Sequence, residues 1–162
     1  MARWSKLQKQ LYQLLDPAVH IQVQCRVVRM ASQRGSTDLP RYWITLGKEV
    51  IWNYPGDFVL PGGGTRGVDS SHVAHYPYET DISAISELIR EYIDTPAREL
   101  LLKRFTTDHW GLVNILRAAD RRIGVRQWQR LRRKIHNHAA LKVLSAREQR
   151  CQREPLAPHP QL

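Results

Sequence analysis

The sequence predicts an α+β protein, with a three-stranded antiparallel sheet packed by an N-terminal helix and a C-terminal helical region. Three observations support this prediction. Apolar and polar residues alternate through residues 19–30, which is typical of a strand with one buried face. Two aromatic and β-branched runs, 40–46 and 49–54, flank a Gly-Lys pair, as in a hairpin. After residue 80, apolar residues recur at helical spacing.

The N-terminal helix is expected over residues 2–15. Trp4, Leu7 and Leu11 fall on one helical face, which would pack on the sheet. Asp16-Pro17 ends the pattern, because a proline disfavours the helical conformation of the residue before it.

The strand at 19–30 would bury Ile21, Val23, Cys25 and Val27 on one face. The hairpin that follows is the strongest local pattern in the chain. A Gly-Lys pair is a weaker turn former than Asn-Gly, so the turn type stays open.

A long loop is expected over residues 55–77, and loops of this length are usually functional or mobile. Its glycine-rich run at 61–67 lacks the Gly-Lys-Ser/Thr ending of a phosphate-binding loop, so a flexible loop is favoured. His72 and His75, with Asp69, have the chemistry of zinc ligands, but histidines in such a loop are more commonly exposed.

Several helices are expected after this loop. Thr80 or Asp81 can cap the first of them with a side-chain oxygen. Asp94 and Pro96 mark its end and the start of a second helix, with Thr95 as the cap.

The basic region, residues 109–150, is expected to form two or three short helices. One apolar stripe lies before Gly124 and comprises Leu112, Ile115, Leu116 and Ala119. A second stripe follows Gly124 and comprises Val125, Trp128, Leu131 and Ile135. A last helix is expected over 139–150. The composition then turns to Pro, His and Gln, so a single domain is predicted over 1–150 and a disordered tail over 151–162.

The excess positive charge of the chain lies in residues 109–153. These residues hold twelve Lys and Arg and two acidic residues, and they therefore contribute the whole net charge of +10. The remaining residues hold thirteen of each and are neutral. This concentration predicts a polyanionic partner. The candidate phosphate-binding residues are Arg117, Arg121, Arg122, Arg126, Arg130, Arg133 and Lys134.

The pattern around Gly124 matches a helix-turn-helix motif only in part. Ala119 and Ile123 are suitably small or apolar, whereas Arg130 and Arg133 stand where that motif usually has aliphatic residues. The alternative is an αα-hairpin with a solvated basic side, which the residue types support at least as well.

The sequence offers little that would carry a reaction. His136-Asn137-His138 contains the letters of a nuclease motif, but such a motif needs its histidines on separate elements around one ion. Cys25 and Cys151 lie far apart, which indicates a reducing compartment. No run suits a signal peptide or a membrane span. We therefore expect a cytoplasmic protein without catalytic residues, metal ligands, cofactor or membrane partner.

Three runs carry a resemblance: RGSTDLPRYWITLGK at residues 34–48, YPYETDIS at residues 76–83 and AADRRIG at residues 118–124. The chain resembles a family of small uncharacterised bacterial proteins, scattered among genomes in the manner of mobile-element cargo. The resemblance covers residues 2–147 and implies a bacterial cytosolic origin, but it transfers no site residues. It directs attention to the hairpin. A possible second site there comprises Arg34, Asp38, Arg41, Tyr42 and Trp43.

Three functions are compatible with these features. The first is a nucleic-acid-binding accessory protein, which contacts phosphates of DNA or RNA mostly independently of base sequence. The alternative is a protein-interaction module, a partner or inhibitor of an acidic protein, using the basic helices or the aromatic hairpin. A nuclease has the least support.

Overall fold

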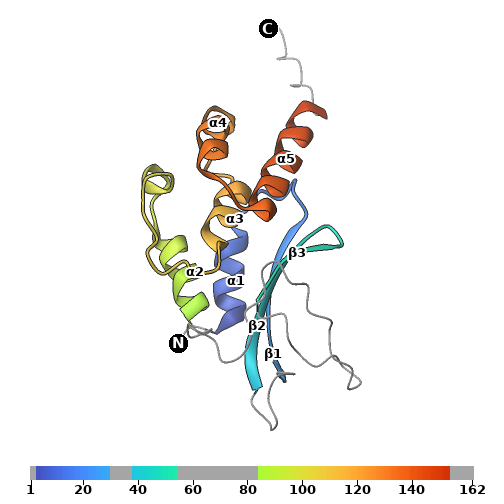
Figure 1. The fold of residues 1–162 in the computed structure, drawn as a ribbon, viewed down its shortest axis with the longest axis vertical. Coiled ribbons are helices and arrows are strands. Elements are labelled where there is room, and N and C mark those ends of the chain that lie inside the picture. Colours follow the sequence, from blue (N-terminus) through green and yellow to red (C-terminus); the bar gives the residue numbers. More distant parts are fainter. Residues whose placement is uncertain (1–2, 30–37, 55–83, 154–162) are drawn as a thin grey trace, which may run out of the picture.

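The computed structural model describes residues 3–29, 38–54 and 84–153, and its fold is α+β, as predicted (Figure 1). The predicted sites at Arg34 and in the 55–77 loop lie outside these residues, as do the caps at Thr80 and Asp81. The elements in chain order are α1 (Trp4–Tyr12), β1 (Ile21–Arg29), β2 (Asp38–Leu46), β3 (Glu49–Tyr54), α2 (Ala84–Asp94), the 3-10 turn η1 (Ala97–Glu99), α3 (Leu112–Ala119), α4 (Val125–Lys134) and α5 (His138–Arg153).

The three strands form an antiparallel sheet in the order β1-β2-β3, which confirms the predicted hairpin. Its turn is Gly47-Lys48, and only Gly47 has a positive φ, of 60°. A positive φ at the first central residue is the pattern of a type II′ turn, which glycine favours because it has no Cβ. This settles the turn type that the sequence left open.

Helices α1 and α2 pack on the same sheet. Leu7 and Leu11 of α1 are buried, and Gln8 donates a hydrogen bond of 2.8 Å to the carbonyl of Val23 in β1. The Tyr42 hydroxyl of β2 lies 2.5 Å from the Ser86 hydroxyl of α2. Side chains of both helices thus fix the apolar face of the sheet.

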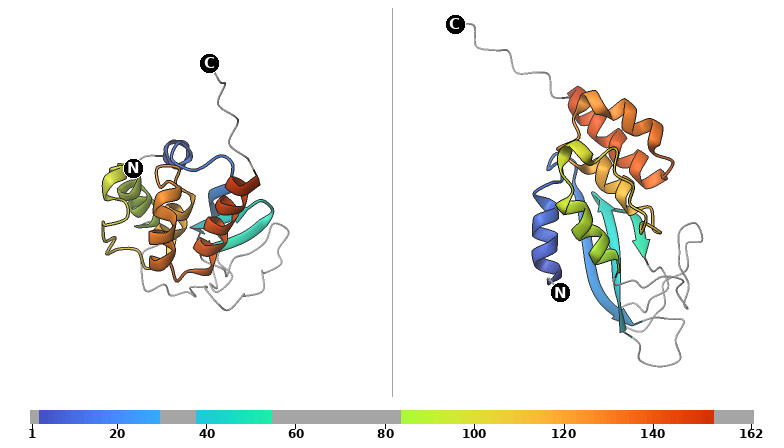
Figure 2. Two further views of the ribbon diagram at one scale, coloured as in Figure 1. Left: turned by 90° about the horizontal axis from the view of Figure 1, so that it is seen from above. Right: turned by 90° about the vertical axis from the view of Figure 1, so that its left-hand side faces the viewer.

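The last three helices contribute buried residues to the same hydrophobic core as the sheet. Helix α3 packs along α5, which α4 also contacts. Figures 1 and 2 place α4 and α5 side by side, at the end of the molecule opposite the outer ends of β1 and β2. Helices α4 and α5 therefore lie far from the outer ends of β1 and β2.

The prediction of a second helix from Thr95 onward is wrong, since only the 3-10 turn Ala97–Glu99 forms there. The Thr95 hydroxyl donates back to the carbonyl of Glu91, at 2.7 Å. No side-chain hydrogen bond caps the 3-10 turn, and α2 ends before Pro96, which disfavours the helical conformation of the residue before it. Pro96 has an extended backbone, with ψ of 148°, which prevents a continuous helical start.

Two residues predicted to be buried are exposed. Val27 is 63% exposed, because the outer end of the β1–β2 pair projects beyond α1 and α2 (Figure 1). Val125 is 60% exposed. It is the first residue of α4, and Trp128 and Leu131 supply the buried side of that helix.

Two helix boundaries also differ from the prediction. Helix α1 ends at Tyr12, before the predicted residue 15. Helix α5 extends to Arg153, so the first residues of the predicted tail at 151–162 are helical. Residues 154–162 lie outside the described part of the chain.

Candidate nucleic-acid interface

The first turn of α3 is fixed by an acidic residue upstream of it. The Asp108 carboxylate accepts hydrogen bonds from the backbone N–H groups of Leu112 and Val113, at 3.0 and 2.9 Å. These are groups that a helix leaves unpaired at its N-terminus. Gly111, with φ of 68°, precedes them, and its carbonyl accepts a hydrogen bond of 2.8 Å from Asn137. The start of α3 is thus tied to the segment that leads into α5.

Asp120, at the end of α3, is fully buried and is the centre of a polar cluster. Its carboxylate accepts hydrogen bonds from the Tyr92 hydroxyl at 2.7 Å and from the Arg122 guanidinium at 2.8 Å. Burial and the neighbouring Asp120 charge hold the pKa of Tyr92 well above its usual value. Arg122 also donates to the carbonyl of Thr95, at 2.9 Å. This cluster joins the α3–α4 turn to the end of α2.

Arg147 of α5 holds the same turn from the other side. Its side chain is 4% exposed and pairs with Asp16 at 3.1 Å. It also donates to the carbonyls of Ala118 and Ile123, at 3.0 and 3.1 Å. Its guanidinium lies 5.0 Å from the Trp128 ring centre, in the range of a cation–π contact. A single buried cation thus joins residue 16, the α3–α4 turn and α4.

Trp128 itself is buried, as predicted, with 8% of its surface exposed. Its indole N–H donates a hydrogen bond of 3.2 Å to the carbonyl of Ile123. Together with Leu131, which is also buried, it fixes α4 against the remaining helices.

The charged groups of three of the predicted phosphate-binding residues are engaged within the fold. Arg117 donates to the carbonyls of Leu100 and Lys103, at 2.8 and 2.6 Å, and burial lowers the pKa of its guanidinium. Arg122 is paired with Asp120 as described. The Lys134 ammonium donates to the carbonyl of Leu101, at 2.7 Å.

The other four predicted residues, Arg121, Arg126, Arg130 and Arg133, are exposed. None of their side chains forms a hydrogen bond or ion pair within the part of the chain that the structure describes. The backbone N–H of Arg121 donates to the carbonyl of Leu14, at 2.8 Å. Three of them belong to α4, and we call Arg126, Arg130 and Arg133 the α4 basic face. Their spacing of three and four residues places them on one side of the helix.

Among the described residues, no acidic side chain pairs with the α4 basic face. No acidic residue occurs between positions 121 and 147. Other cations of this region do meet acids. Arg122 and Arg147 pair with Asp120 and Asp16 as described, Arg132 pairs with Glu148 at 2.6 Å, and Lys142 pairs with Glu49. None of these pairs involves the α4 basic face.

The structure does not gather the possible second site on one face of the hairpin. Tyr42 is buried toward the helices, where Trp4 meets its ring edge-on at 5.6 Å between centres. Arg41 and Trp43 lie on the opposite side, with the Arg41 guanidinium 4.2 Å from the Trp43 ring centre. Arg41 also donates to Asn53, at 2.8 Å. Asp38 belongs to β2, but its side chain, like all of Arg34, lies outside the described residues.

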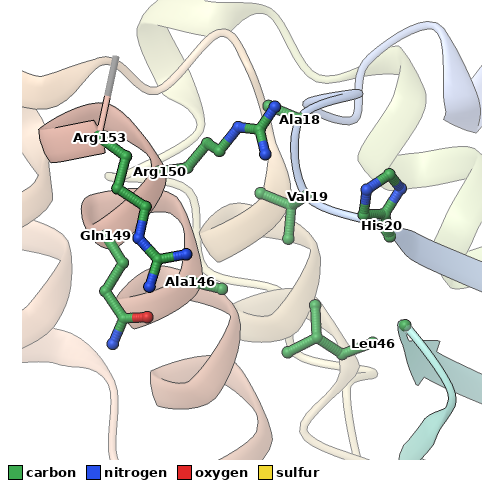
Figure 3. A pocket seen from close by; sticks show the side chains of 9 residues that line it. Ala18, Val19, His20, Leu46, Ala146, Gln149, Arg150 and Arg153 are labelled. Atoms are coloured by element: carbon green, nitrogen blue, oxygen red, sulfur yellow. The ribbon is translucent and has the colours of Figure 1, made fainter. Parts of the chain in front are cut away.

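One surface pocket, of about 300 Å³, lies between the C-terminal end of α5 and the residues that precede β1. Figure 3 shows Gln149, Arg150 and Arg153 on α5, across the pocket from Val19 and His20. A pocket of about 410 Å³ is lined by Arg117 and Lys134 among others, whose charged groups are already engaged with backbone carbonyls.

The described residues include no group of three or more His, Cys, Asp or Glu placed to hold a metal ion. Within the same part of the chain, no helix has the length and apolar character needed to cross a membrane. Cys25 is half-buried, and burial raises the pKa of its thiol.

Sequence reasoning identified the exposed arginines from charge concentration but missed the supporting residues. Asp108, Asp120 and Arg147 carry that support. Asp120 was detectable as an acid within a basic run. Arg147 continues the helical spacing of Ala140, Val143 and Leu144, which are buried, so that spacing could have placed it on the buried face of α5.

Comparison with protein families finds a match over most of the chain. The model of the SF0329 protein family matches residues 3–61 and 68–147, which is most of the chain. No curated protein and no solved structure matches the chain.

Proposed function

The chain belongs to the SF0329 protein family, and we propose that it binds nucleic acid through the α4 basic face by contacts with phosphates. One observation carries the proposal. Arg126, Arg130 and Arg133 are exposed together, without a partner among the described residues, in a stretch without acids. Such a surface favours a polyanion, and its phosphate contacts are mostly independent of base sequence.

The geometry of α4 supports simultaneous contacts. Residues three and four positions apart on a helix have Cβ atoms about 5–6 Å apart. Three guanidinium groups on one side of a ten-residue helix therefore reach the same polyanion together. Each phosphate neutralised releases counterions, which makes the affinity fall steeply with salt.

The scaffold supports binding because it holds α4 in place beforehand. Trp128 and Leu131 are buried beneath the helix, and Arg147 holds the preceding turn. A partner then immobilises only long side chains and does not have to order a helix, which lowers the free-energy cost of association.

The test compares two charge-matched variants in equilibrium binding to random-sequence duplex DNA and RNA. The first replaces Arg126, Arg130 and Arg133 with Gln. The control replaces Lys6, Lys9 and Lys48, which are exposed outside the basic region, with Gln. Fluorescence anisotropy between about 50 and 200 mM salt gives the affinity and its salt dependence.

We expect the α4 variant to reduce the slope of log affinity against log salt by about 2 to 3, at roughly 0.9 per lost contact. The control should retain the wild-type slope within about 1 unit, because its residues lie away from the interface. Equal losses in both variants would overturn the proposal. Binding of the wild type to an acidic protein but not to either nucleic acid would favour the interaction module.

A further inference from the structure

The exposed surface of α4 contains two parallel rows of side chains with different chemistry. Val125, Gln129 and Arg133 succeed each other at intervals of four residues and are all exposed. Arg126, Arg130 and Lys134 form the adjacent row at the same interval. The second row is wholly cationic, whereas the first combines an apolar, an amide and a guanidinium side chain.

The first row has the groups that distinguish base edges in the DNA major groove. A small apolar side chain contacts the thymine methyl group, glutamine pairs with adenine through two hydrogen bonds, and arginine pairs with guanine in the same way. In the second row, the guanidinium groups of Arg126 and Arg130 suit phosphates, whereas the Lys134 ammonium is engaged with the carbonyl of Leu101. A helix lying in the groove needs both kinds of row, one directed at the bases and one at the backbone.

The burial of Trp128 favours a duplex over a single strand as the ligand of α4. Single strands are bound largely by stacking of bases on aromatic side chains. The only aromatic residue of α4 is Trp128, which is buried with Arg147 against its ring. Helix α4 therefore has no exposed ring on which a base could stack.

Groove dimensions favour duplex DNA over duplex RNA as the ligand of α4. The major groove of B-DNA is about 12 Å wide and admits an α-helix with side chains, which is about 10–12 Å across. The major groove of A-form RNA is too narrow for side chains to read. Side chains of the types found in the Val125–Gln129–Arg133 row thus suit B-form DNA.

The position of α4 leaves this surface accessible. Its buried side, at Trp128 and Leu131, faces the protein, and α5 lies beside it (Figure 2). Arg121, in the turn before α4, is exposed and adds a cation near the start of the helix. The turn spans residues 120–124, which is longer than in a helix-turn-helix motif, so the inference depends on α4 and not on that motif.

We infer that α4 enters the major groove of duplex DNA and reads base edges through Val125, Gln129 and Arg133, while Arg126 and Arg130 contact the flanking phosphates. This inference rests on the proposed function. It assigns Arg133 to a base edge, leaves Arg126 and Arg130 on the phosphates, and adds sequence selectivity to phosphate binding.

The test is selection of bound sequences from a randomised duplex DNA library, followed by affinity measurements. The wild type should enrich a short sequence. Gln129→Ala should weaken binding to that sequence roughly 5- to 100-fold, the range for one lost bidentate base contact. It should leave the affinity for random duplex and its salt slope unchanged, since glutamine carries no charge. The control is Gln152→Ala, at an exposed position of α5, which should behave as the wild type does.

The other possible outcomes bear differently on this inference and on the proposed function. Salt-sensitive binding of duplex DNA without enrichment of any sequence would overturn this inference and leave the proposed function intact. So would tighter binding of single-stranded DNA or RNA than of duplex DNA, or an unchanged selected sequence in Gln129→Ala. Absence of binding to any nucleic acid would overturn both proposals. Because Gln129 is exposed, a circular dichroism melt of Gln129→Ala should match the wild type and exclude misfolding.

Discussion

Two groups of arginines lie within the same basic stretch of sequence and have opposite surroundings. Arg117, Arg122 and Arg147 are engaged with backbone carbonyls, and the last two also pair with carboxylates. The α4 basic face, Arg126, Arg130 and Arg133, has none of these partners among the described residues. One group joins segments of the chain, and the other leaves its charge for a partner molecule.

The difference shows that net charge is a poor measure of available charge. A guanidinium group has five N–H donors in a fixed plane, so it can satisfy carbonyls from several segments at once. Arg147 does this with Ala118 and Ile123 while it pairs with Asp16. Binding capacity therefore depends on the arginines that remain after such internal contacts are made.

Replacing Trp128 should produce the largest loss of stability, because it removes the main buried side chain of α4. Trp128→Ala is expected to lower the free energy of unfolding by about 3–5 kcal/mol, measured by urea denaturation. Gln129→Ala, the exposed neighbour, serves as the control and should change it by less than about 0.5 kcal/mol. Wild-type stability in Trp128→Ala would mean that the indole is not part of the core.

Replacing Arg147 should have the next largest effect. Arg147→Met keeps a long apolar side chain but removes the ion pair with Asp16 and the hydrogen bonds to the carbonyls of Ala118 and Ile123. Of these two carbonyls, that of Ile123 keeps the Trp128 indole N–H as a donor. Loss of one partner from a buried ion pair is expected to cost about 3 kcal/mol, again measured in urea. A loss no greater than that of Arg133→Met, its exposed counterpart, would contradict the contrast between the two groups.

Tyr92→Phe should have a smaller effect that depends on pH. The variant loses one hydrogen bond to Asp120, which is expected to cost about 1 kcal/mol near pH 8. The pKa of Tyr92 is raised in the folded state by burial and by the Asp120 charge. The unfolded tyrosine therefore ionises first, above about pH 10, and the wild type loses stability as the pH rises.

The phenylalanine variant cannot lose stability in this way. The difference in unfolding free energy between wild type and Tyr92→Phe should therefore shrink above about pH 10. Denaturation curves recorded at several alkaline pH values would show it. A constant difference across that range would indicate that the pKa of Tyr92 is not raised in the folded state.

The sequence was sufficient to predict the sheet because its signals are local. Alternation in β1 and the aromatic runs of β2 and β3 lie within single strands, and the Gly47-Lys48 turn joins adjacent residues. The helix predicted from Thr95 was wrong because no side-chain cap forms there and only a 3-10 turn follows Pro96. The Thr95 hydroxyl instead donates to the carbonyl of Glu91, a contact that the residue types do not reveal.

The roles of the arginines could not be predicted from local patterns, because they depend on contacts between distant parts of the chain. Arg147 and Asp16 are 131 positions apart, and Arg122 reaches the carbonyl of Thr95, 27 positions away. Helical spacing predicted that Arg126, Arg130 and Arg133 would be exposed, and this is confirmed. It could not show that Arg117 lies against Leu100 and Lys103, which follow an irregular turn.

The smallest effect on stability is expected for charge reversal on the α4 basic face, and the same variant tests the contrast between the two groups most directly. Arg130→Glu with Arg133→Glu should change the free energy of unfolding by less than about 0.5 kcal/mol, because exposed charges contribute little. In equilibrium binding to heparin and to duplex DNA, this variant should lose affinity almost completely at about 0.15 M salt. If it instead unfolds as the wild type does and binds both polyanions with wild-type affinity, the α4 basic face is not the binding surface.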